Sequence, residues 1–190
     1  MGGKSGRNNR RNIMNGFMIG FALLGIVSFA AALLFISDKE GFWLRIAGNP
    51  DTGQVDFASL RKTGRPNEGL ACPDGFCPNA EADIRTGTYA VSPSTLREQI
   101  LQLLEDDQNY RRVDGDQDKN RLRYVAYSPS MRFPDLVNIK LIDLEPEKSS
   151  IAVHARAQLG YSDNGANLRR IKRILRSIER FPENPVTNEQ

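Results

Sequence analysis

One stretch near the start of the chain holds 24 residues without a charged side chain. It runs from Ile13 to Ile36 and reads IMNGFMIGFALLGIVSFAAALLFI, with Asn15 and Ser28 as its clearly polar side chains. A helix of this length spans about 36 Å, enough to cross a hydrocarbon core of about 30 Å with some tilt. A core helix of a soluble protein rarely needs so long an uncharged run. The pattern therefore predicts a transmembrane helix at residues 13–36, in contact with membrane lipid.

The apolar run shares one feature with a cleavable signal peptide, because Ala30 and Ala32 form an A-x-A sequence. The run continues for four more apolar residues, however, and it is longer than the apolar core of a typical signal peptide. We therefore expect an uncleaved signal anchor.

The charge on either side of this run is asymmetric. Four cations precede it: Lys4, Arg7, Arg10 and Arg11. The charges that follow it nearly cancel, so the positive-inside rule predicts that residues 1–12 stay in the cytoplasm. The rest of the chain then crosses the membrane. In a bacterial cell, this places the anchor in the inner membrane and the domain in the periplasm or outside the cell.

A strip of small residues lies along the predicted membrane helix. Gly16 and Gly20 form a G-x-x-x-G pattern, which lets helix backbones approach closely in lipid. The strip predicts a membrane protein partner, although glycine is also common in membrane helices that have none.

Beyond residue 85, the hydrophobic periodicity predicts two helices and several strands. Ser92 and Pro93 suit the start of a helix that runs to about Asp107, and a second helix is predicted from about Asp163 to Arg180. The predicted strands are Gly87–Val91, Tyr110–Val113, Arg121–Ser128, Val137–Leu144 and Ser150–Leu159. This order predicts an α+β fold, a mostly antiparallel sheet with two helices packed on one face.

Between the membrane helix and this domain, glycine, proline, aspartate and asparagine recur at short intervals. We interpret residues 37–71 as a connector, residues 72–181 as the soluble domain and residues 182–190 as a disordered tail. Trp43 has two interpretations: it lies in the aromatic belt at the membrane interface, or it packs on the domain.

Composition adds little to this picture. The formal net charge is +3 and the mean hydropathy is −0.46 with the apolar run included. Nucleic-acid binding is disfavoured by the predicted compartment and by the lack of a recognisable motif.

Cys72 and Cys77 bracket a short Pro-Asp-Gly-Phe segment. Outside the cytosol, so close a pair favours a disulfide, and free thiols are the alternative. A metal site usually needs four ligands, and the chain has one histidine, His154, far from the pair. We expect neither a metal nor a cofactor.

Basic side chains alternate with apolar ones along the predicted strands. If neighbouring strands pair, one face of the sheet carries Arg121, Arg123, Lys140, His154 and Arg156. Such a face predicts an anionic ligand, which could be a lipid headgroup, an acidic polysaccharide or an acidic protein. The plainer interpretation of His154 is a polar residue on the open face of a sheet.

Three separated motifs resemble those of domain-of-unknown-function family 1499. They are Arg65-Pro66-Asn67, Ser130-Met131-Arg132-Phe133-Pro134-Asp135, and Gly160-Tyr161-Ser162-Asp163-Asn164-Gly165-Ala166-Asn167 with Arg169-Arg170-Ile171. The chain departs from the family pattern at Gln158 and Leu168, where arginines are expected. The resemblance implies domain boundaries, and it implies no particular activity.

The leading hypothesis is a membrane-anchored envelope protein whose domain binds or scaffolds. The sequence shows no recognisable catalytic spacing. The rival hypothesis is therefore an enzyme whose site cannot be recognised from spacing, and a third hypothesis is an accessory subunit of a membrane complex. The candidate binding residues are Arg132, Asp135, His154, Arg156, Asp163, Asn167 and Arg170. An enzyme would need these side chains, Arg156 apart, to converge in one pocket.

Overall fold

The computed structural model describes residues 5–115 and 118–179, and the chain divides between Phe42 and Trp43 into two compact units. The first unit holds α1 (Ser5–Ser37) and the first residues of α2 (Lys39–Ala47). Within the described residues, one helix is long and apolar enough to cross a membrane: Gly16–Ser37, with a mean hydropathy of 2.6 and no part of its most apolar window buried inside the protein. Two parts of the prediction lie outside the described residues: residues 1–4 of the predicted cytoplasmic segment, and the predicted tail at residues 182–190.

Asp38 separates the two helices. Its carboxylate accepts a hydrogen bond from the Gly41 backbone N–H at 2.8 Å, which satisfies a free donor at the start of α2. The Ser37 hydroxyl donates to the Leu34 carbonyl at the end of α1.

The second unit is built on one six-stranded sheet. Its strands are β1 (Glu68–Cys72), β2 (Ile84–Arg85), β3 (Tyr110–Arg112), β4 (Arg121–Tyr127), β5 (Pro134–Glu145) and β6 (Lys148–Ala157). Their order across the sheet is β2-β1-β6-β5-β4-β3, and every pair is antiparallel except β1 with β2.

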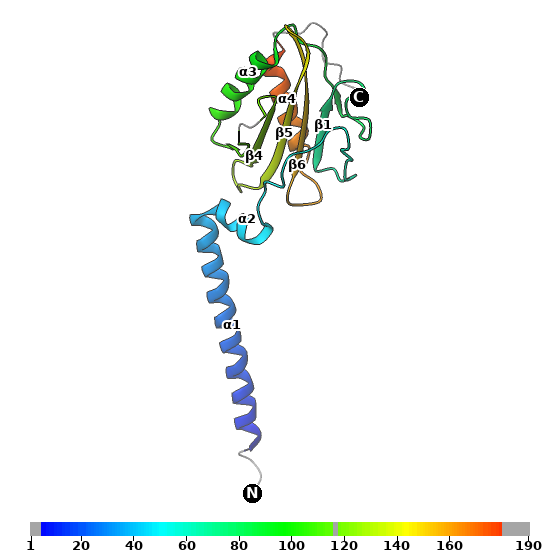
Figure 1. Cartoon of the computed structure of the whole chain (residues 1–190). Coiled ribbons are helices and arrows are strands. Elements are labelled where there is room, and N and C mark those ends of the chain that lie inside the picture. Colours follow the sequence, from blue (N-terminus) through cyan, green and yellow to red (C-terminus); the bar gives the residue numbers. More distant parts are fainter. Residues whose placement is uncertain (1–4, 116–117, 180–190) are drawn as a thin grey trace. The chain divides into compact units, whose positions relative to one another are not determined.

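Two amphipathic helices, α3 (Pro93–Glu105) and α4 (Ala166–Ile178), pack on one face of this sheet (Figure 1). Ser92 caps α3, because its side-chain oxygen accepts from the Thr95 N–H and Pro93 fills the first turn. Both helices bury an apolar stripe against alternate residues of β4, β5 and β6. The predicted α+β class and the two predicted helices are therefore confirmed.

The first part of the sheet differs from the pattern-based prediction. The predicted strand Gly87–Val91 forms a single bridge, between Tyr89 and Ser149. A full strand lies earlier, at β1, and all of it except Cys72 falls in the stretch interpreted as a connector. Gly69 interrupts the apolar pattern of this strand. A Cβ on that residue would lie 3.0 Å from the Ile171 side chain of α4, so the close packing leaves little room for a larger residue.

The opposite face of the sheet is covered by the chain that precedes β1. Phe57 is buried against Leu70 and Ala152, together with the cysteine pair. Cys72 and Cys77 form a disulfide, as predicted.

Candidate functional site

The three sequence motifs meet beside the start of α4. The Asn67 side-chain amide donates to the Gly160 carbonyl at 2.8 Å, and the Asn167 amide donates to the Asn67 carbonyl at 3.2 Å. The Asp163 N–H donates to the Pro66 carbonyl at 3.2 Å. Both asparagines are buried, so these bonds satisfy polar groups that water cannot reach. The cluster joins β1, β6 and α4.

A buried ion pair completes this cluster. The Arg170 guanidinium donates to the Asp135 carboxylate at 2.9 Å and to the Asn167 side-chain oxygen, and the side chains of Arg170 and Asp135 are each 10% exposed. Burial raises the pKa of Asp135, and the charge of Arg170 opposes that rise without cancelling it. The pair links the N-terminal part of α4 to the start of β5.

Asp163 has a structural task at the same place. Its carboxylate accepts from the backbone N–H groups of Gly165 at 2.7 Å and Asn167 at 2.8 Å. Gly165 adopts a left-handed conformation, with φ of 74°, just before the helix begins. The Asp163 carboxylate thus satisfies a free backbone donor in the first turn of α4. Each of its two oxygens accepts one of these bonds.

His154 lies on the opposite face of the sheet. Its Nε2 is 3.2 Å from the Glu68 carboxylate, and the two side chains are 6% and 1% exposed. Burial lowers the pKa of His154 more than Glu68 raises it. Burial raises the pKa of Glu68, but hydrogen bonds from Thr63 and His154 outweigh it and leave that pKa below its usual value. A neutral imidazole that donates to an ionised carboxylate fits both directions.

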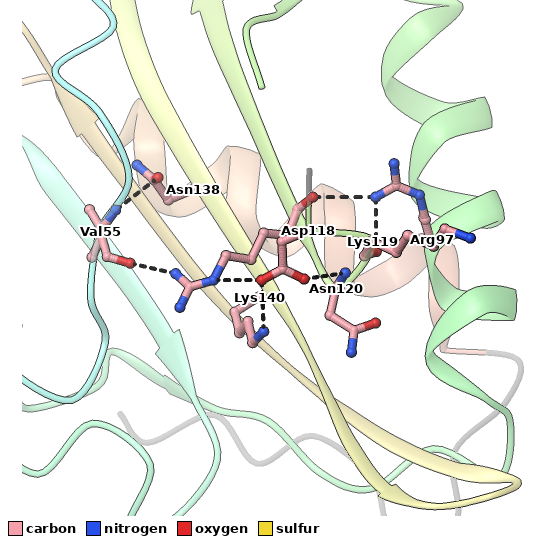
Figure 2. A network of polar contacts seen from close by, with 8 residues as sticks. Val55, Arg97, Asp118, Lys119, Asn120, Asn138 and Lys140 are labelled. Carbon is pink, nitrogen blue, oxygen red and sulfur yellow. Dashed lines mark hydrogen bonds and ion pairs between the residues drawn. The ribbon is translucent and has the colours of Figure 1, made fainter. Parts of the chain in front are cut away.

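The predicted basic face exists, and acidic partners accompany much of it. Arg121 and Lys140 share the Asp118 carboxylate, at 3.1 and 3.4 Å, and Arg121 also donates to the Val55 carbonyl (Figure 2). Arg123 Nε lies 2.7 Å from the Asp51 carboxylate. These carboxylates offset the charge of three cations. Two of the pairs, Asp51 with Arg123 and Asp118 with Lys140, join segments distant in sequence that no local pattern connects. An anionic ligand on this face stays a prediction.

The seven candidate residues therefore fall into separate places. Asp135, Asp163, Asn167 and Arg170 form the motif cluster on the helix face. His154 and Arg156 lie on the other face, as alternate residues of β6. Arg132 lies in the β4–β5 connection with φ of 56°, its guanidinium 4.7 Å from the centre of the Tyr127 ring and bonded to Asn109. The structure does not bring the six residues of the enzyme hypothesis into one pocket.

A polar groove lies between the end of α3 and α4. It has a volume of about 820 Å³ and is lined by Gln99, Gln102, Leu103, Asp106, Asp107, Gln108, Asn109, Arg173, Arg176 and Ser177. Across it, Arg173 donates to Asp107 at 2.6 Å. Burial raises the pKa of Asp107, but its bonds to Arg173 and Asn109 outweigh this and lower that pKa overall. Sequence reasoning missed the groove, because its walls come from segments whose packing no local pattern reveals.

Two further features bear on ligands. Among residues 5–115 and 118–179, no group of three or more histidine, cysteine, aspartate or glutamate side chains could hold a metal ion. A Cβ placed on Gly16 or Gly20 would meet no atom within 4 Å apart from the neighbouring backbone of its own helix, so the small-residue strip is open. A helix partner at that strip stays a prediction.

The fold and the motif cluster define an α+β domain, and a candidate membrane span precedes it in the chain. The chain belongs to the family described as "Protein of unknown function (DUF1499)", whose model matches residues 46–178. A search of curated proteins finds no match. Among solved structures, the chain is similar to the Zhui aromatase/cyclase from Streptomyces sp. R1128, with 12% identity and a TM-score of 0.28 over 51% of this chain and 82% of that chain. So low a TM-score supports no functional argument.

Proposed function

We propose that this chain is a single-pass membrane protein of the cell envelope, with its N-terminus in the cytoplasm and its domain in the periplasm or outside the cell. The observation that carries the proposal is the helix Gly16–Ser37, whose large apolar side chains are exposed. Exposed apolar surface on this scale is stable in lipid and unfavourable in water. The Cys72–Cys77 disulfide supports the compartment, because thiols persist as disulfides mainly in oxidising environments.

Protease protection tests both the span and its direction. In spheroplasts that carry a C-terminally tagged chain, added protease should remove the tag while a cytoplasmic marker stays intact. The control variant replaces the four cations before the span, Lys4, Arg7, Arg10 and Arg11, with glutamine and should lose the uniform orientation. A tag that resists protease until detergent is added would refute the orientation, and recovery of the intact chain in the soluble fraction would refute the span.

We infer that the domain binds a partner rather than catalyses a reaction. The groove between α3 and α4 supports this, because its amides, carboxylates and two arginines offer donors and acceptors for a polar protein segment. The Arg170–Asp135 and His154–Glu68 pairs support it too, since in each pair the two side chains are engaged with one another. Binding a partner, unlike catalysis, requires no reactive side chain in the groove.

Site-specific photocrosslinking in cells tests the binding role. The crosslinking residue replaces Gln102, which is exposed in the groove, or Glu98, which is exposed on the same helix and does not line the groove. A discrete adduct from position 102 and none from position 98 is the expected result. Equal adducts at both positions, or none at either, would contradict binding in the groove.

A further inference from the structure

The exposed large apolar side chains of the second unit are unevenly distributed. Among its described residues they are Leu44, Ile46, Met131, Phe133, Leu144 and Tyr161, with exposures from 38% to 71%. Met131 and Phe133 lie in the β4–β5 connection and Tyr161 lies in the β6–α4 connection. These two connections lie at the same end of the sheet, because Asp135 near the start of β5 pairs with Ala157 at the end of β6 (Figure 1).

The last residues of α2 are fixed to this same end. Trp43 Nε1 donates to the Met131 carbonyl at 2.8 Å, and its ring centre lies 4.7 Å from that of Phe133. The Gln158 amide donates to the carbonyls of residues 47, 48 and 49 at 3.1–3.3 Å. These bonds hold Leu44 and Ile46 next to the two connections. We call Leu44, Ile46, Met131, Phe133 and Tyr161 the apolar end.

Leu144 is the one member of this set that lies away from the apolar end. It lies near the far end of β5, ten residues from Pro134. At about 3.3 Å per residue, this separates it from the apolar end by about 33 Å along the strand. Leu144 therefore provides an internal comparison site.

Chain length and charge favour lipid as the occupant of the apolar end. Leu44 follows Ser37, the last residue of the candidate span, by seven residues, and seven residues span at most about 25 Å. Exposed arginines accompany the apolar side chains: Arg45 lies between Leu44 and Ile46, and Arg169 lies in the first turn of α4. Aromatic and apolar groups with arginines beside them suit the interface of an anionic bilayer.

We propose that the apolar end docks on the lipid interface of the membrane that holds α1, so that the sheet domain rests on the bilayer. The proposal rests on the proposed function, because it requires the span. Apolar side chains then enter the headgroup boundary while Arg45 and Arg169 meet anionic headgroups. A second copy of the chain or a protein partner on this surface is the competing outcome.

Tryptophan quenching by lipids brominated at a defined depth tests the proposal on the full chain. The protein has one tryptophan, Trp43, and its place close to the span makes it a poor reporter of docking. Probes are therefore placed in a Trp43→Phe background, which keeps an aromatic ring against Phe133. The substitutions are Tyr161→Trp at the apolar end, Leu144→Trp at the far end and Phe29→Trp within the span.

Each probe chain is reconstituted in vesicles of phosphatidylcholine and phosphatidylglycerol with bromine near the headgroup or near the bilayer centre. Docking predicts at least twofold quenching of the Tyr161→Trp probe by shallow bromine and little quenching of the Leu144→Trp probe. The added pair Leu44→Asp and Ile46→Asp should remove at least half of the Tyr161→Trp quenching, whereas added Leu144→Asp should not. Far-UV circular dichroism checks that each variant is folded.

The possible failures are distinguishable. If deep bromine does not quench the Phe29→Trp probe, the span is absent and the proposed function fails. If that probe is quenched and the Tyr161→Trp probe is not, the span stands and docking is refuted. Equal quenching of the Tyr161→Trp and Leu144→Trp probes also refutes docking at this end. Shielding of the Tyr161→Trp probe that depends on protein density and not on bromine would assign the surface to a second copy.

Discussion

Replacing Arg170 with alanine should destabilise the domain far more than the same change at Arg173, one turn further along α4. Arg170 and Asp135 form a pair in which both side chains are 10% exposed, so removing the arginine leaves a carboxylate buried without its cation. Breaking a buried pair in this way costs about 3–5 kcal/mol. Arg173 is itself 48% exposed and pairs with Asp107, so its loss should cost about 0–1 kcal/mol. Arginine and alanine are both good helix formers, so propensity does not explain the difference.

The pH dependence of this cost follows from the raised pKa of Asp135. A carboxyl group whose folded pKa is raised binds more protons in the folded state, so its ionisation opposes folding as pH rises through its ordinary value toward the raised one. Without Arg170, that opposition grows at neutral pH, whereas near pH 4 the protonated group needs no cation. The excess cost of Arg170→Ala should therefore shrink on acidification.

Urea unfolding of the full chain in detergent micelles, followed by Trp43 fluorescence, measures both effects. The expected result at pH 7 is a loss of about 3–5 kcal/mol for Arg170→Ala and at most about 1 kcal/mol for Arg173→Ala. The first loss should be visibly smaller at pH 4. Equal losses for the two variants, or a loss for Arg170→Ala that does not change with pH, would refute this account of the pair.

Three other predictions concern stability. Because the pKa of His154 is lowered on folding, the domain should lose stability as pH falls through the ordinary histidine value of about 6.5, and thermal melts of His154→Gln should show a flatter pH dependence over that range. Replacing both Cys72 and Cys77 with serine should lower the free energy of unfolding by about 2 kcal/mol, measured by urea titration, and an unchanged midpoint would contradict this. Gly69→Ala places a Cβ 3.0 Å from the Ile171 side chain and should cost about 1–3 kcal/mol in the same titration, and an unchanged midpoint would contradict this.

The sequence predicted those elements whose signals are local. Ser92 with Pro93 marks the start of α3, and the long apolar stripe of α4 defines that helix. Strand β1 escaped prediction because Gly69 interrupts its pattern, and the need for that glycine arises only when α4 packs on it. A local pattern cannot contain that information.

The candidate site was harder to predict for a related reason. Alternation correctly placed Arg121, Arg123 and Lys140 on one face, but the charge of a face depends also on its neighbours. Asp51 reaches Arg123 from a loop 72 residues away. Asp118 lies three residues before Arg121 and also reaches Lys140, 22 residues away on the neighbouring strand. The same holds for His154, whose partner Glu68 lies 86 residues away. Pairing across the sheet decides whether such a residue is free to bind a ligand.

The family motifs gain a physical interpretation from their common location. Asn67, Asp135 and Gly160 all lie at the end of the sheet where β5 begins and β6 finishes, and their bonds hold the start of α4 there. Gln158, where the family pattern has arginine, joins the same end to the last turn of α2. The motifs thus fix the geometry of the connections that carry Met131, Phe133 and Tyr161, without supplying a reactive group. A family defined by such motifs would share the shape of this end, and its members could differ in what the exposed side chains contact.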